Sequence, residues 1–150
     1  MFKKILVPLD SSPMAEAALP LARSLAECYG ADLIVLHVNT PLAIQYYAPE
    51  MLTTVAELEQ TARVDANTYL HHTAATLMDR GIKASVVMKD AVTAANAILD
   101  YADHNGVDLI AMSTHGRSGI GRWLLGSEAD KVVHGAKMPV LLVRPDESKP

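Results

Sequence analysis

Cysteine is almost absent from this sequence, which has only Cys28 among its 150 residues. One cysteine excludes an internal disulfide framework and a thiolate metal cluster. A basic surplus is missing as well, since 13 Lys and Arg against 17 Asp and Glu leave a formal net charge of −4. This balance argues against a basic surface for nucleic acid or anionic lipid, but it leaves room for a small pocket that is locally positive.

Long apolar runs are also missing. The first apolar run, at residues 5–9, is far too short for a signal peptide, and no stretch approaches the roughly 20 apolar residues of a membrane span. We therefore expect a cytoplasmic protein without membrane insertion. A composition of 50% hydrophobic and 20% charged residues argues against disorder. The length suits one domain, which we expect to cover residues 1–144, with a polar tail at 145–150.

Strand-like and helix-like patterns alternate along the chain, without internal repeats. This alternation is typical of a doubly wound, Rossmann-like α/β domain with a parallel sheet and helices on both faces. We expect five strands in the order 3-2-1-4-5, with a ligand site beyond the carboxyl ends of the strands where that order reverses. The expected strands are 5–9, 33–38, 82–88, 109–112 and 139–143. The expected helices run from Ser12 as N-cap to Gly30, from 51 through Leu77 to an end at Gly81, over 94–102 and from about 127 to 135.

The strongest functional signal lies between the fourth strand and the last helix, from Ser113 to Ser127. It reads STHGRSGIGRWLLGS, with three glycines in six positions, which leaves backbone amides exposed. Ser127 begins a helix and forms a capping-box pattern with Asp130. Amides at a helix start favour phosphate, so the segment predicts either an anion site or a plain loop before a capped helix. Its spacing matches neither the dinucleotide fingerprint nor a Walker loop.

These residues resemble the ATP-binding class of the universal stress protein family. The resemblance covers nearly the whole chain and is carried by residues 4–10, 36–38, 108–112 and 139–143 together with the glycine segment. The family motif is Gly-x2-Gly-x9-Gly-Ser/Thr. This chain reads Ser113-x2-Gly116-x9-Gly126-Ser127, so a serine replaces the first glycine.

The resemblance implies that the chain binds ATP, or AMP or ADP, with Mg²⁺ or Mn²⁺ held mainly by phosphates and water. By the same resemblance we assign binding roles to named residues. They are Pro8, Leu9 and Val38 around adenine, Asp10 and Ser113 at the ribose, Gly116 at the α-phosphate, Arg117, Ser118 and Gly119 over the phosphates, and Gly126 and Ser127 at the terminal phosphate, with Thr114, His115 and Glu128 beside them.

We expect a regulatory stress-response module rather than an enzyme, with no catalytic residues. Hydrolysis needs an oriented water, and Asp10, the only acid near the switch point, is assigned to ribose. ATP would order residues 113–127 and alter a surface read by a protein partner. Two alternatives stay open: a slow ATPase that depends on metal and Ser127, and a nucleotide-independent dimer. The resemblance also implies a homodimer, for which the apolar edge strand at 140–143 gives a physical reason.

The remaining candidates have mostly structural interpretations. His37, on a buried strand, is expected to be a core histidine with a hydrogen-bond partner. His71 and His72 are adjacent, so they face different sides of a helix and make a poor metal pair. Trp123 is expected to anchor its loop by packing, and Tyr46–Tyr47 are candidates for an adenine lid or a partner contact.

Overall fold

The computed structural model of the chain describes residues 1–41, 48–115 and 125–145. Some of the residues singled out in the sequence lie outside these ranges, and their predictions stay predictions. They are Tyr46, Tyr47, Gly116, Arg117, Ser118, Gly119, Trp123 and the tail from 146 onward.

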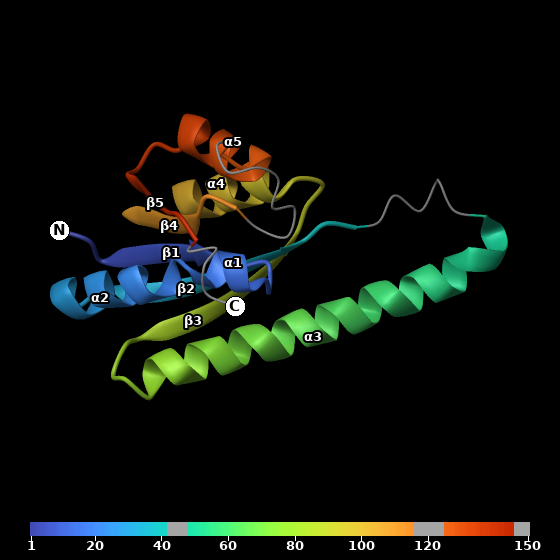
Figure 1. The fold of residues 1–150 in the computed structure, drawn as a ribbon, viewed down its shortest axis with the longest axis horizontal. Coiled ribbons are helices and arrows are strands. Elements are labelled where there is room, and N and C mark those ends of the chain that lie inside the picture. The colour runs from blue at the N-terminus through green and yellow to red at the C-terminus, as the bar shows by residue number, and fades with distance from the viewer. Residues whose placement is uncertain (42–47, 116–124, 146–150) are drawn as a thin grey trace.

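The described residues form one parallel sheet, which crosses the middle of Figure 1. Its strands are β1 (Lys4–Pro8), β2 (Asp32–Asn39), β3 (Ala84–Asp90), β4 (Leu109–Ser113) and β5 (Val140–Val143). Their order is β3-β2-β1-β4-β5, and each neighbouring pair is parallel. Both the expected fold class and the expected strand order are therefore confirmed.

Helices cover both faces of the sheet (Figure 1). One face carries α1 (Pro13–Glu16), α2 (Leu19–Tyr29) and α3 (Leu52–Met78), and the other carries α4 (Ala94–His104) and α5 (Ser127–Gly135). A short 3-10 turn, η2 (Pro49–Met51), precedes α3.

Successive strand residues are buried on opposite faces. Ile5 and Val7 of β1 pack in the cluster under α2 and α3, whereas Leu6 packs in the cluster under α4 and α5. All three are fully buried. Burial of both faces explains why the strands read as continuous apolar runs, and each such side chain stabilises the fold by about 1.5–3 kcal/mol.

The single helix expected after the first strand is wrong, because the segment forms two helices. Pro20 lies in the first turn of α2 and has no N–H to donate back to the preceding turn. Ala17 and Ala18 instead donate to the carbonyls three residues earlier, over 3.3 and 3.4 Å. The expected ends are confirmed: Ser12 caps α1 through its side chain, and Gly30 closes α2 with a φ of 65°.

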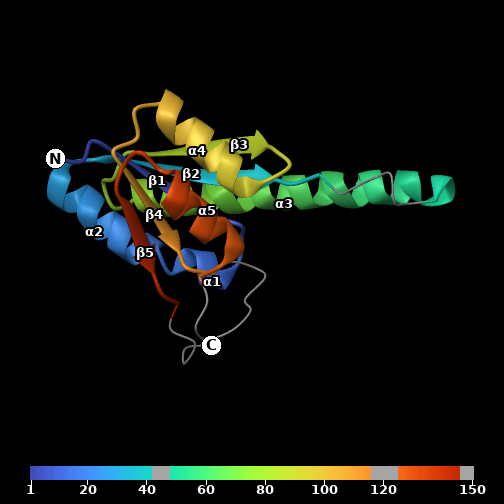
Figure 2. The same cartoon turned by 90° about the horizontal axis from the view of Figure 1, so that it is seen from above.

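The longest helix among the described residues is α3, whose N-terminal half extends well beyond the sheet (Figures 1 and 2). Its C-terminal half is anchored by Leu70, Ala74 and Leu77, which are all buried where α3 packs on β2 and β3. Within the described residues, no helix combines the length and the apolar character that a bilayer span requires.

Candidate functional site: a cavity at the switch point of the sheet

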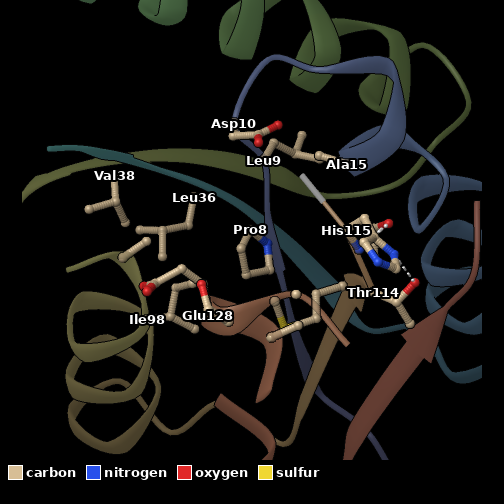
Figure 3. Close-up of a pocket in the computed structure, with 16 residues that line it drawn as sticks. Pro8, Leu9, Asp10, Ala15, Leu36, Val38, Ile98, Thr114, His115 and Glu128 are labelled. Carbon is tan, nitrogen blue, oxygen red and sulfur yellow. Dashed lines mark hydrogen bonds between the residues drawn. The ribbon is translucent and has the colours of Figure 1, made fainter. Parts of the chain in front are cut away.

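A cavity of about 240 Å³ opens at the carboxyl ends of β1, β2 and β4, bordered by the first turn of α5 (Figure 3). The strand order reverses here, because β1 is followed in sequence by β2 on one side and is paired with β4 on the other. We call it the switch-point cavity. Every expected site residue that the structure describes lines it: Pro8, Leu9, Asp10, Val38, Ser113, Thr114, His115, Gly126, Ser127 and Glu128.

The end of β1 is held by main-chain and side-chain hydrogen bonds. Leu9 N donates to Leu36 O over 2.8 Å, and the buried His37 donates through Nδ1 to Leu9 O over 2.8 Å. This confirms His37 as a core histidine with a partner. The next residue, Asp10, accepts from the backbone N and the hydroxyl of Ser12. Its carboxylate therefore shapes the turn into α1 while it lines the cavity.

The start of α5 lies close against the end of β4. Gly126 N donates to Thr114 O over 2.9 Å, and Thr114 N in turn donates to Val143 O over 2.9 Å. A Cβ atom on residue 126 would lie 2.9 Å from Thr114 O, closer than real Cβ contacts come. Glycine at this position is therefore a steric requirement of the close approach.

The expected capping box at Ser127 and Asp130 is wrong. Gly126 is the N-cap of α5, Ser127 is its first helical residue, and the N-cap residue makes no side-chain cap hydrogen bond. The close approach of Gly126 to Thr114 begins the helix one residue earlier than the serine pattern suggests. The first amides of α5 therefore border the cavity without a side-chain cap from the N-cap residue, and they carry the positive end of the helix dipole.

Glu128 connects α5 with α4. Its Oε2 accepts from Ala95 N over 2.6 Å, and its Oε1 accepts from Lys131 Nζ over 2.7 Å. Burial raises the pKa of Glu128, but the hydrogen bonds from Lys131 and Ala95 outweigh it and lower the pKa overall. The carboxylate thus takes the place of a side-chain cap on α4, since the N-cap residue Thr93 provides none.

The cavity has an apolar side and a polar side. In Figure 3, Leu36, Val38 and Ile98 gather on one side, and Thr114 and His115 lie on the other. On the polar side, His115 Nδ1 lies 3.0 Å from Thr114 Oγ1, whereas His115 Nε2 is buried without a hydrogen-bond partner. Among the described residues, no group of three or more His, Cys, Asp or Glu side chains is arranged to hold a metal.

The sequence identified only Pro8, Leu9 and Val38 of the apolar lining. The residues missed are Ala15, Leu36, Ala94, Ile98, Met112 and Ala129. Their spacing is that of ordinary core positions. Only weak sequence signals could have pointed to these residues: Leu36 shares a strand face with Val38, and Ile98 follows Ala94 by one helical turn.

A doubly wound parallel sheet with a two-sided cavity at its switch point defines an α/β domain with a candidate ligand site. The sequence pattern of the universal stress protein family matches residues 1–144, and the chain belongs to that family.

Individual relatives agree with this assignment. A universal stress protein of Thermus aquaticus is 35% identical over 147 residues, which cover 96% of this chain and 100% of that protein. The solved structure of MJ0577, from Methanocaldococcus jannaschii, covers 99% of both chains at 29% identity with a TM-score of 0.85.

Two more distant structures share the fold. A universal stress protein solved in complex with cAMP is 21% identical, covers 97% of this chain and 98% of its own, and has a TM-score of 0.62. One from Archaeoglobus fulgidus in complex with dAMP is 18% identical, covers 95% of this chain and 98% of its own, and has a TM-score of 0.66.

Proposed function

We propose that this universal stress protein binds ATP in the switch-point cavity and acts as a nucleotide-dependent regulatory module of the stress response. The observation that carries the proposal is the uncapped N-terminus of α5, which borders the cavity. Helix amides without an acceptor and the positive dipole end favour a phosphate. The partnerless Nε2 of His115 on the cavity wall is a second polar atom that a ligand would satisfy.

The two sides of the cavity suggest the orientation of the nucleotide. The adenine ring would lie against Leu36, Val38 and Ile98, with Pro8 and Leu9 beside it. Asp10 would accept from the ribose hydroxyls, and the phosphates would approach the α5 amides, Ser127 and the Thr114–His115 side. Mg²⁺ or Mn²⁺ would be held by phosphates and water, in keeping with the absence of a three-ligand cluster among the described residues.

The more distant relatives support a nucleotide as the ligand class. The cAMP and dAMP complexes concern those proteins, and at their low identity the likeness to this chain extends to the fold alone. The choice of a triphosphate comes from the resemblance of the glycine segment to the ATP-binding class of the family, and the α5 terminus supports a phosphate at this place.

We propose binding without rapid turnover. Both carboxylates in the cavity lining are already engaged by protein donors, Asp10 by Ser12 and Glu128 by Ala95 and Lys131. We therefore assign neither carboxylate as a general base that activates water. Release of inorganic phosphate from ATP, measured with Mg²⁺ for the wild type and for Ser127→Ala, distinguishes this proposal from a slow ATPase.

Gly126→Val tests the binding site directly. Valine tolerates the φ of −58° and ψ of 144° at this position, but its Cβ would collide with Thr114 O and push α5 away from β4. We expect ATP affinity to fall by at least about tenfold in calorimetric titration, with the helical circular dichroism signal retained. As a matched control, Gly135→Ala at the other end of α5 meets only the flexible Leu99 side chain and should bind ATP normally.

Unchanged ATP affinity in Gly126→Val would refute the assigned cavity. Mass spectrometry of small molecules released from the purified protein gives an independent check, because a nucleotide that copurifies with the chain identifies the ligand without a choice of probe.

We further propose that the protein is a cytoplasmic homodimer joined through β5. That strand forms one edge of the sheet, and its residues are only partly buried. An unpaired apolar edge favours strand pairing with a second copy. The only cysteine, Cys28, is exposed and free, which fits a reducing compartment.

A further inference from the structure

A second cavity, of about 380 Å³, lies between the α1–α2 segment and the C-terminal half of α3. We call it the α2–α3 groove. One side is formed by Glu16, Leu19, Pro20 and Arg23, and the other by α3 residues between Tyr69 and Arg80. These helices cover the same face of the sheet (Figure 1). The groove shares no lining residue with the switch-point cavity.

The groove is closed at one end by a hydrogen bond between its two sides. The Tyr69 hydroxyl donates to Glu16 Oε1 over 2.8 Å. Burial, and then the hydrogen bond and charge of Glu16, raise the pKa of Tyr69, so the phenol stays a donor at neutral pH. Glu16 is the only acid in the groove lining, and its carboxylate is engaged by this bond.

Two arginines lie further along the groove. On α3, Thr76 follows Tyr69 by seven residues, about 10 Å along the helix, and on the other side Arg23 of α2 follows Glu16 of α1 across the helix break. Arg80 lies in the turn that follows α3, where its backbone N donates to Leu77 O over 3.1 Å, and it lines the same groove. The groove therefore has Glu16, which accepts from Tyr69, at one end and the two arginines at the other.

The two guanidinium groups at the basic end have few protein partners. Arg23 Nε is buried without a hydrogen bond and forms one ion pair, with Glu27, at 3.6 Å between Nε and Oε1, whereas Arg80 is exposed. Among the ion pairs of the described residues, none includes Arg80. His72 adds a third nitrogen-bearing side chain to the lining. A buried N–H without an acceptor gains from any anion that reaches it.

Apolar side chains line the groove beside these cations. Leu19 and Pro20 come from α2, and the buried Leu77 comes from α3. Thr73 and Thr76 donate their hydroxyls to main-chain carbonyls one turn earlier, each over 3.0 Å. The donors available to a ligand are therefore the arginine forks, which favour planar or tetrahedral oxyanions.

From these contacts we propose that the α2–α3 groove is a second binding site, for a small organic anion. Its phosphate or carboxylate head binds Arg23 and Arg80, and its apolar body lies against Leu19, Pro20 and Leu77. The volume is within the range of small-molecule sites. The site is independent of nucleotide binding in the switch-point cavity.

Phenyl phosphate, which combines an oxyanion with an apolar ring, tests the proposal in a titration followed by 1H–15N NMR. We expect saturable shifts of the Arg23, Thr76 and Arg80 amides, with tighter binding than for inorganic phosphate and no binding of phenol. The double variant Arg23→Gln/Arg80→Gln should weaken binding by at least about tenfold. Arg63→Gln, on the same helix but outside the groove, loses a charge as well and should bind as the wild type does.

Three results would overturn the proposal: no saturable shift of groove amides, equal binding of inorganic phosphate and phenyl phosphate, or unchanged affinity in the double variant with a wild-type-like spectrum. Gly126→Val separates the two sites, since it should lose ATP binding while the groove still binds phenyl phosphate. If the groove responds normally and ATP fails to bind the wild type, the nucleotide proposal fails alone.

Discussion

The carboxylate of Glu128 shows how a single side chain organises the wall of the switch-point cavity. It accepts hydrogen bonds from Ala95 at the start of α4 and from Lys131 in α5. A negative charge at a helix N-terminus is favourable, because it compensates amides that lack intrahelical partners. The resemblance suggested Glu128 as a binding residue, but its hydrogen bonds indicate that it also joins α4 and α5, the two helices beside the switch-point cavity.

Glu128 should therefore contribute stability that depends on pH. Burial raises its pKa, but the bonds from Lys131 and Ala95 prevail and lower it below the usual 4.5. This contribution is fully present above pH 4.5 and is lost as the pH falls through the lowered pKa of the folded state. We expect Glu128→Gln to cost about 0.5–1 kcal/mol at pH 7, and the difference from wild type should shrink in acid.

Urea unfolding followed by circular dichroism across this pH range measures the effect. Glu57→Gln, on the exposed surface of α3, is the control for loss of one carboxylate. If the stability difference between the wild type and Glu128→Gln stays constant from neutral pH to pH 3, the stabilising role assigned to the Glu128 carboxylate is wrong.

At the scale of elements, α3 has two halves with different energetics. Its C-terminal half packs on β2 and β3 through Leu70, Ala74 and Leu77. Its N-terminal half extends past the sheet (Figure 2), and there Leu58 is 60% exposed. Tertiary packing supplies most helical stability in proteins, so the two halves should respond differently to loss of a leucine.

Leu70→Ala should destabilise the protein by about 2–5 kcal/mol, because Leu70 is fully buried and its loss leaves a cavity in the core. Leu58→Ala removes the same atoms from an exposed position of the same helix, and we expect a change within about 0.5 kcal/mol. Denaturant unfolding of both variants measures the difference. Equal losses would mean that the N-terminal half of α3 is covered in solution.

At the scale of the whole molecule, the sheet order leaves β5 as one edge. Ile110 N and Thr114 N of the β4 side donate to Pro139 O and Val143 O over 3.1 and 2.9 Å. Because main-chain groups alternate in direction along a strand, the N–H and C=O groups of Val140 and Leu142 lie on the open edge. These groups are the ones that a second copy would pair with.

Leu142→Pro should weaken the proposed dimer. Proline removes the edge N–H at residue 142 without removing a bond to β4, and edge strands tolerate it. Two such bonds are lost in a symmetric pair, so we expect the dissociation constant to rise by at least about tenfold in sedimentation equilibrium. Leu142→Val keeps the N–H and should stay dimeric. A wild type that sediments only as a monomer at micromolar concentration would remove the dimer proposal.

Much of the fold could be predicted because its signals are local. Apolar runs such as residues 33–36 mark strands buried on both faces, and Gly30 marks a helix end through its left-handed φ of 65°. The helix break before Pro20 escaped prediction, since the alanine spacing continues across it. The serine pattern predicts Ser127 as the cap, whereas the structure has Gly126 there. The reason is the close contact of residue 126 with Thr114, which no local sequence pattern contains.

The order of apolar and polar residues by itself determined the alternation of strands and helices, and hence the parallel sheet and the place of its ligand cavity, because burial of both sheet faces leaves few other arrangements. Only the tertiary structure decided which core-like residues line that cavity and which arginines share a groove. Ile98 lines the same cavity as Val38, and Arg23 lines the same groove as Arg80. The packing of helices on the sheet brings these positions together, and their separation along the chain does not predict it.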